Sequence, residues 1–167
     1  MQPVVIELAG PPEAKGRARS ALIRRRDGGS FISNYTPANT RKYESHLRLA
    51  AQQAMGDRPL IDGPVWLRVD AAMTIPTSWS DKKRKAAAAG LILPTKKPDW
   101  DNYAKICDSL NGVVFNDDVQ VCAGMVFKFY SERPRLRIEV REIELHTWPV
   151  LVQSPPETLP LFARGAV

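Results

Sequence analysis

The chain has 167 residues, 44% hydrophobic and 25% charged, a composition that indicates one ordinary globular domain rather than a disordered or fibrous protein. Lys and Arg outnumber Asp and Glu by 24 to 18, and the formal net charge of +6 favours a polyanionic partner. The sequence has only two cysteines, no phosphate-binding Gly-x-x-x-x-Gly-Lys loop, no signal peptide and no apolar run near the ~20 residues that cross a membrane. We therefore expect a cytoplasmic protein without disulfides and without a membrane partner.

The first third of the sequence predicts a strand, a basic hairpin and a helix. Residues 4–8 are rich in Val and Ile and indicate a strand. Residues 31–35 indicate the second strand of a hairpin that turns at residues 27–29. A Thr-Pro pair then opens residues 36–55, in which apolar side chains recur at helical spacing.

The rest of the sequence predicts more strands and two further helices. We expect strands over residues 65–73, 113–115, 119–130 and 136–143, and helices over residues 81–89 and 99–110. Together these elements predict an α/β fold, a single compact domain with a mixed β-sheet packed with two or three helices. Residues 1–147 would form this domain, and residues 148–167, which are rich in Pro, a C-terminal tail.

An acidic cluster lies inside this basic sequence. Asp99 and Asp101 open the last predicted helix, and Asp117 and Asp118 occupy the turn before the next strand. Acids held close together repel one another, so a fold keeps them together mainly around a divalent cation. Mg²⁺ held by such oxygen ligands could activate water and stabilise the negative charge that develops in phosphodiester hydrolysis.

The predicted helix also places a lysine beside these acids. Asp101, Lys105 and Asp108 recur at i, i+4 and i+7, so they share the face opposite the apolar one. Lys105 could orient the attacking water or neutralise the phosphorane, and the sequence leaves both roles open. A structural interpretation also stays open, because Asp-x-Asp is common at helix starts and Asp-Asp is common in turns.

The run from Lys97 to Lys105, followed by Asn116-Asp117-Asp118, closely resembles the signature of the RusA family of Holliday-junction resolvases. Residues 10–19 and 35–43 resemble the N-terminal pattern of phage-type members, so the resemblance covers about residues 4–145. One departure is the spacing from Lys105 to Asp108, a residue shorter than the family pattern, which leaves the role of Asp108 open.

The resemblance implies Asp99, Asp101 and Asp118 as metal-binding aspartates, Lys105 as the essential lysine, and Asp117 as a further acid at the metal site. It also implies a compact homodimer that resolves four-way DNA junctions by paired symmetric nicks in recombination and repair. Mg²⁺ would be the cofactor, with Mn²⁺ as a substitute, in a bacterial or phage-infected cell. A two-fold dimer would present two sites to a two-fold junction.

Blocks of basic residues flank the acids and are expected to contact DNA phosphates, setting the affinity and its dependence on salt. Each of them taken alone is more often a solvated charge than a contact. They are Lys15, Arg17, Arg19, Arg24, Arg25, Arg26, Lys82, Lys83, Arg84, Lys85, Lys96 and Lys97.

The tail contains a short peptide that resembles a docking motif. Thr158-Leu159-Pro160-Leu161-Phe162 is similar to the Gln-Leu-x-Leu-Phe peptide by which bacterial DNA enzymes bind the sliding clamp, with Thr158 in place of Gln. The segment from Leu159 to Phe162 is therefore a candidate clamp contact. The alternatives are a disordered tail, or one that packs across the dimer.

Other functions fit the same residues. A nuclease of broader habit, cutting flaps, forks or ordinary duplex, would use the same carboxylates. A non-catalytic junction-binding protein would be marked by loss of an acid or of the lysine, and none is lost. A structural Ca²⁺ site is disfavoured, because no loop with calcium-ligand spacing is present.

Overall fold

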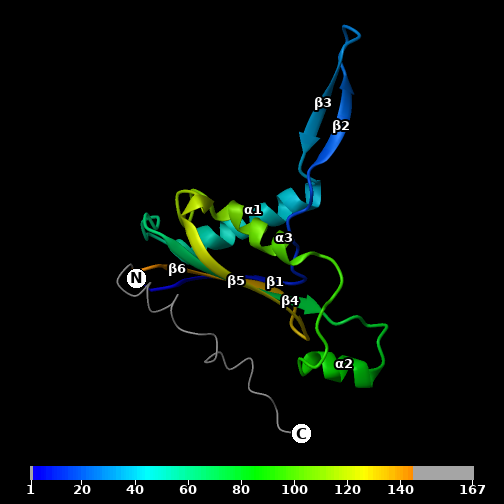
Figure 1. The fold of residues 1–167 in the computed structure, drawn as a ribbon, viewed down its shortest axis with the longest axis vertical. Helices are drawn as coiled ribbons and strands as arrows, with labels where there is room; N and C mark the ends of the chain where they lie inside the picture. Colours follow the sequence, from blue (N-terminus) through cyan, green and yellow to red (C-terminus); the bar gives the residue numbers. More distant parts are fainter. Residues whose placement is uncertain (1, 145–167) are drawn as a thin grey trace.

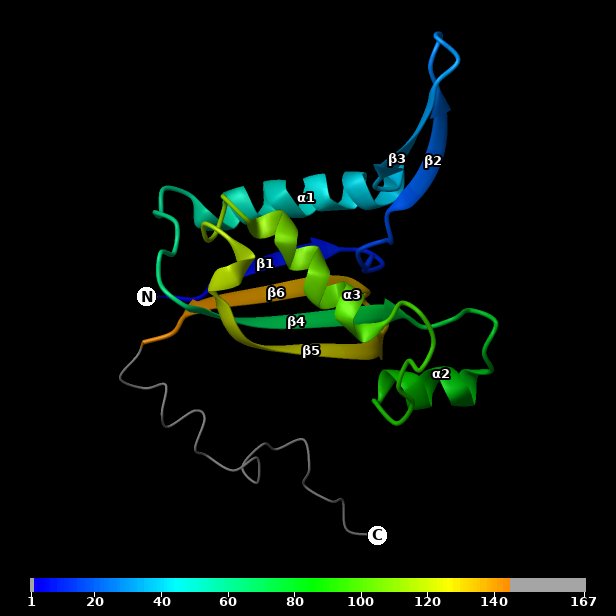
Figure 2. The ribbon, with the colours of Figure 1, turned by 45° about the horizontal axis from the view of Figure 1, so that its top comes forward.

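The computed structural model describes residues 2–144, which form a four-stranded sheet with helices on one face and a separate two-stranded hairpin (Figures 1 and 2). The strands of the larger sheet are β1 (Val4–Ala9), β4 (Val65–Thr74), β5 (Val121–Ser131) and β6 (Arg135–Glu142). Their order is β1-β6-β4-β5, and β4 pairs with β5 in parallel while the other neighbours are antiparallel. The predicted α/β fold with a mixed sheet is confirmed.

The helices lie at two places relative to this sheet. They are α1 (Ala38–Met55), α2 (Asp81–Ala88), α3 (Trp100–Lys105) and the short 3₁₀ helices η1 (Ile106–Leu110) and η2 (Asp118–Gln120). In Figure 2, α1 and α3 cover the same face of the sheet, whereas α2 lies beyond the end of β4. The sheet therefore buries one face against helices and leaves the other without a helical layer among residues 2–144.

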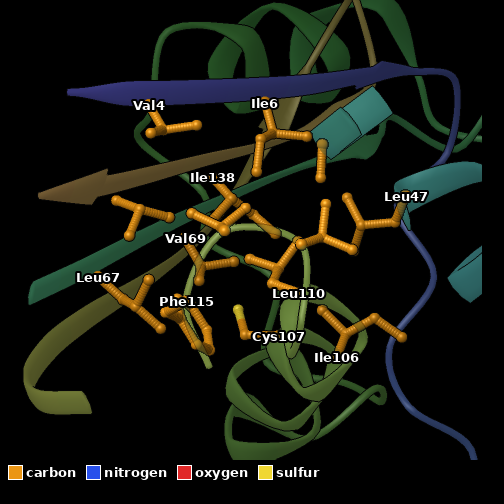
Figure 3. Packing of buried hydrophobic residues seen from close by; sticks show 14 of the residues in the cluster. Val4, Ile6, Leu47, Leu67, Val69, Ile106, Cys107, Leu110, Phe115 and Ile138 are labelled. Atoms are coloured by element: carbon orange, nitrogen blue, oxygen red, sulfur yellow. The ribbon is translucent and has the colours of Figure 1, made fainter. Parts of the chain in front are cut away.

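Alternation along the strands decides which side chains form the core. Val65, Leu67 and Val69 of β4 point toward the helices and are buried, together with Ile138 of β6 and Leu47 of α1 (Figure 3). Each such aliphatic side chain, when fully buried, stabilises the fold by roughly 1.5–3 kcal/mol. This core fixes the positions of α1 and α3 over the sheet.

The opposite face of the sheet carries a network of charged side chains, which we call the ionic face. Nε of Arg68 donates to Oδ1 of Asp70 at 2.9 Å, and Nη2 of Arg137 donates to Oε2 of Glu139 at 2.8 Å. Arg141 also donates to Glu139, at 2.6 Å through Nε. Asp70 and Glu139 are both buried, and an arginine beside each satisfies the carboxylate that the strand alternation places there.

The predicted hairpin is confirmed, with its turn at residues 27–29. It consists of β2 (Arg19–Arg24) and β3 (Ser30–Tyr35), paired antiparallel from Arg19 opposite Tyr35 to Arg24 opposite Ser30. Gly28 has a φ of 85°, a left-handed conformation that favours glycine at the turn. Figures 1 and 2 both show the hairpin projecting away from the sheet.

Two predicted elements differ from the structure. Residues 113–115 are not a strand but a buried turn, in which Phe115 makes isolated bridges with Ile61 and Asn111. A short buried apolar run has the same composition in either case, so the pattern could not separate them. The helix predicted over residues 99–110 is α-helical only through Lys105 and continues as 3₁₀ helix.

The structure leaves part of the sequence analysis without a test. No helix among residues 2–144 is long and apolar enough to cross a membrane. The tail of residues 148–167, and with it the candidate clamp contact from Leu159 to Phe162, lies outside the described residues.

Candidate active site

Buried side chains anchor the segment that carries most of the candidate residues. Tyr103, Ile106 and Leu110 are fully buried, which confirms the apolar stripe expected of this helix. Asp99 precedes α3 with extended backbone, at φ −70° and ψ 152°, and Trp100 begins the helix. The buried side chains hold α3 in place, and its other side presents charged residues to solvent.

Asp101 and Lys105 form an ion pair on this exposed side. Nζ of Lys105 lies 2.7 Å from Oδ2 of Asp101, one helical turn away, and both side chains are more than half exposed. The hydrogen bond from Lys105 holds the pKa of the Asp101 carboxyl below its usual value. Ion pairs open to water contribute little to stability, so these two groups remain available to another partner.

Asp108, whose role the sequence left open, pairs with Lys15. Its Oδ2 accepts from Nζ of Lys15 at 2.6 Å, and Glu44 lies 3.8 Å from the same nitrogen. Partial burial disfavours the charged form of Lys15, but the hydrogen bond to Asp108 and the nearby carboxylates of Glu44 and Asp118 raise its pKa. Lys15 therefore lies among the acids of the site.

The two aspartates of the predicted turn accept hydrogen bonds from different groups. Asp117 caps η2, since its Oδ1 accepts from the backbone N–H of Val119 at 3.0 Å and Gln120 completes the capping box. Oδ1 of Asp118 accepts from Nδ2 of Asn111 at 3.1 Å, so this carboxylate lies near the end of η1. Asp117 therefore fits the structural interpretation that the sequence left open for these acids, because it caps a helix.

A hollow of about 390 Å³ opens beside these residues, between α3, η1 and the strands β4 and β5. Lys105, Asp108 and Asp118 are part of its lining, along with apolar side chains of the sheet. Trp100 borders it as well, and its Nε1 donates to the backbone oxygen of Val126 at 2.9 Å. The hollow thus combines carboxylates, an ammonium and an apolar wall at the solvent surface.

The four predicted metal ligands are not arranged as a complete metal site in this structure. Within residues 2–144, no group of three or more His, Cys, Asp or Glu side chains is positioned to hold a metal ion. Asp101 and Asp118 are engaged instead by Lys105 and Asn111. Carboxylate oxygens suit Mg²⁺, but in this arrangement Asp99, Asp101, Asp117 and Asp118 do not form a finished site.

The predicted DNA contacts fall on separate segments on either side of α3. Arg19 and Arg24 lie on β2, with Arg17 just before it and Arg25 and Arg26 at the hairpin turn. The next block lies on α2 and in the chain that leads to α3, and it comprises Lys82, Lys83, Arg84, Lys85, Lys96 and Lys97. Figures 1 and 2 show α3 between the hairpin and α2.

The sequence did not predict the roles of two residues of the site. Asn111 was not singled out, although it binds Asp118. Lys15 was assigned to DNA contact, and its partner Asp108 is 93 positions away in the chain. Pairs at such separation leave no local pattern, so only the fold could reveal them.

A family match includes both the hairpin and the acidic segment. The sequence profile of a family described as Endodeoxyribonuclease RusA matches residues 9–141. A protein of Bacillus subtilis (strain 168), named Uncharacterized protein YqaN, is 38% identical over 137 residues, which is 80% of this chain and 92% of that protein.

Proposed function

The chain belongs to the RusA endodeoxyribonuclease family, and from that membership we propose that it resolves four-way DNA junctions by paired symmetric nicks. One observation carries the proposal. The exposed Asp101–Lys105 pair stands beside a hollow that Asp108 and Asp118 also line, with basic segments on either side. A lysine open to solvent between basic segments suits a phosphodiester backbone. The acids beside it suit the divalent cation that we propose below.

Lys105 is the residue we assign to charge stabilisation. Negative charge builds on the phosphate oxygens as a phosphodiester is attacked, and a positioned ammonium stabilises it. Nζ of Lys105 lies 2.7 Å from Asp101 and lines the hollow, so the ammonium stands beside the site before DNA arrives. Because the pair is exposed, exchange of a carboxylate for a phosphate oxygen costs little.

Mg²⁺, with Mn²⁺ as a substitute, is the cofactor that we propose. Asp99, Asp101 and Asp118, with Asp117 nearby, would hold it, and when bound it would supply charge stabilisation and an activated water. Support comes from the oxygen-donor chemistry of these residues and from the family. Calorimetric titration of Mg²⁺ into the protein without DNA should show saturable binding that Asp118→Asn weakens; cleavage at full rate in EDTA would contradict the proposal.

The assembly that we propose is a homodimer, because two equivalent sites match the two-fold symmetry of a junction. Light scattering on the purified chain should give twice the monomer mass, and a monomer that still makes paired nicks would exclude the dimer. The candidate clamp contact from Leu159 to Phe162 stays a separate proposal. Deletion of residues 157–167 should abolish pull-down by the sliding clamp; an intact chain that is not pulled down would end it.

The proposed function is tested by cleavage of a labelled four-way junction in Mg²⁺, beside linear duplex and a flap. The wild type should nick opposite strands of the junction symmetrically and leave the duplex intact. Equal cutting of all three substrates would favour the broader branched-DNA or flap nuclease. Junction binding without cleavage would favour the non-catalytic junction-binding protein.

A further inference from the structure

The β2–β3 hairpin, residues 19–35, carries large apolar side chains outside the hydrophobic core, and we call it the arm. Among residues 2–144 its strands pair only with each other, and Figures 1 and 2 show it standing clear of the sheet. Leu22 is 64% exposed and Ile32 is 70% exposed. An isolated two-stranded hairpin has little stability of its own. Because Leu22 and Ile32 are exposed and outside the core, folding of the chain does not explain why they are apolar.

The two faces of the arm differ in how much they are covered. Leu22 lies opposite Ile32 in the strand register, so the two side chains form one aliphatic pair. On the other face Ile23 lies opposite Phe31, and the guanidinium of Arg25 stands 5.0 Å over the Phe31 ring. Arg25 therefore covers part of the second face, and the Leu22–Ile32 pair is the more exposed of the two.

Positive charge surrounds the exposed pair. The arm contains four arginines, Arg19, Arg24, Arg25 and Arg26, against a single acid, Asp27. DNA phosphates would be attracted to such an arm. Proteins that insert Leu or Ile between base steps combine such apolar wedges with basic side chains on the phosphates.

The segment that leads into the arm, residues 15–18, is hydrogen-bonded to the candidate active site. The backbone N–H of Lys15 donates to the oxygen of Asn102 in α3 at 3.0 Å, and its Nζ donates to Asp108 at 2.6 Å. A Cβ on Gly16 would stand 2.6 Å from Oγ1 of Thr40, so the chain passes closely against the start of α1. DNA held by the arm is therefore held at a defined distance from α3.

We propose that the arm is a branch-point wedge, in which Leu22 and Ile32 pack against base planes where the duplex arms meet while its arginines hold the flanking phosphates. This inference rests on the proposed function and names the device that selects a junction. Separation of stacked bases costs a few kcal/mol per step, and the branch point, where strands exchange between duplex arms, is where a junction differs from continuous duplex.

The experiment places 2-aminopurine at the branch point, because its fluorescence rises when the base unstacks. The full-length chain carries Asp101→Asn in every sample, so that the DNA stays intact. Binding of the chain with an unaltered arm should raise the fluorescence at the branch point and leave a probe remote from it unchanged. The pair Leu22→Thr and Ile32→Thr should bind the junction about tenfold more weakly and lose the fluorescence rise.

Ile23→Thr, on the opposite face of the arm, is the matched control and should keep the fluorescence rise. An unchanged melting temperature will show that the core of each variant is folded, and Thr, which strands favour, keeps the strand propensity of the arm. If the chain prefers the junction to duplex, but the Leu22/Ile32 variant and the unaltered arm give equal fluorescence, the wedge is overturned. The proposed function is then unaffected. No preference for the junction over duplex overturns both.

Discussion

Two acid–base clusters on this molecule use the same kinds of side chain and differ in how they meet water. On the ionic face, Glu139 lies between Arg137 and Arg141, and its side chain is 8% exposed. On α3, the side chains of Asp101 and Lys105 are 53% and 58% exposed. The first cluster is fixed by burial, whereas the second can exchange one partner for another.

Charge and pKa alone do not separate the two clusters. Burial opposes ionisation of Glu139, but the hydrogen bonds from Arg137 and Arg141 more than offset it and lower its pKa. The hydrogen bond from Lys105 lowers the pKa of Asp101 as well. Both acids are thus ionised at neutral pH, and exposure to solvent distinguishes the pair that we propose to be functional from the structural one.

The largest effect is expected at Lys105. Lys105→Gln should slow junction cleavage by about a hundredfold or more, because it removes the ammonium that stabilises the phosphorane. The free energy of unfolding should hardly change, since the lost pair is exposed. Single-turnover cleavage and urea unfolding measure the two effects.

Lys42→Gln is the control for that variant, because Lys42 is an exposed cation on α1, outside the hollow and outside the blocks expected to contact DNA. It should cut at nearly the wild-type rate. Lys105→Gln with normal cleavage would mean that the exposed pair is as structural as the ionic face.

Glu139 should show the reverse behaviour. Glu139→Gln should lower the free energy of unfolding by about 2 kcal/mol, because Arg137 and Arg141 would face each other without their shared acid. Cleavage per folded molecule should not change. Glu7→Gln is the control, since Glu7 is about half exposed and lies 3.8 Å from Arg135; an equal loss in this variant would contradict the importance of burial.

Lys15 sharpens the comparison, because it is a partly buried cation next to the site. Lys15→Gln should reduce kcat about tenfold by releasing Asp108, with little change in KM or in the salt dependence of binding. A phosphate contact would instead raise KM and flatten the salt dependence. Lys42→Gln, an exposed change on α1, is the matched control.

The smallest effect is the dependence of stability on pH at the ionic face. Because the pKa of Glu139 is lower in the folded protein than its ordinary value of 4.5, the unfolded chain binds more protons in the window between the two. Stability should therefore fall as the pH falls through that window, and Glu139→Gln should reduce the fall. Urea unfolding from about pH 6 to about pH 3 measures it, and an identical pH profile for the variant would refute the assignment.

Local patterns predicted much of the fold. The apolar stripe of Tyr103, Ile106 and Leu110 and the glycine turn of the hairpin depend on neighbours in the chain, and both were confirmed. The pattern predicts a strand at residues 113–115, which are a turn, because burial rather than periodicity determines their composition.

The site was less predictable, because its geometry depends on contacts distant in sequence. The spacing of Asp101 and Lys105 predicts that they share one helix face, and in the structure the two form an ion pair there. The partners of Asp108 and Asp118 are Lys15 and Asn111, and the change to 3₁₀ geometry after Lys105 alters the direction of the side chains that follow. The convergence of four aspartates therefore remains a proposal.

The most direct test of this account is a parallel measurement on Asp101→Asn and Glu139→Gln, in which junction binding, junction cleavage and urea unfolding are followed for both. We predict that Asp101→Asn stays folded and binds the junction without cutting it, while Glu139→Gln unfolds at lower urea and cuts normally while folded. Cleavage by Asp101→Asn at the wild-type rate, or loss of cleavage in folded Glu139→Gln, would contradict the assignment of the active site to the exposed side of α3.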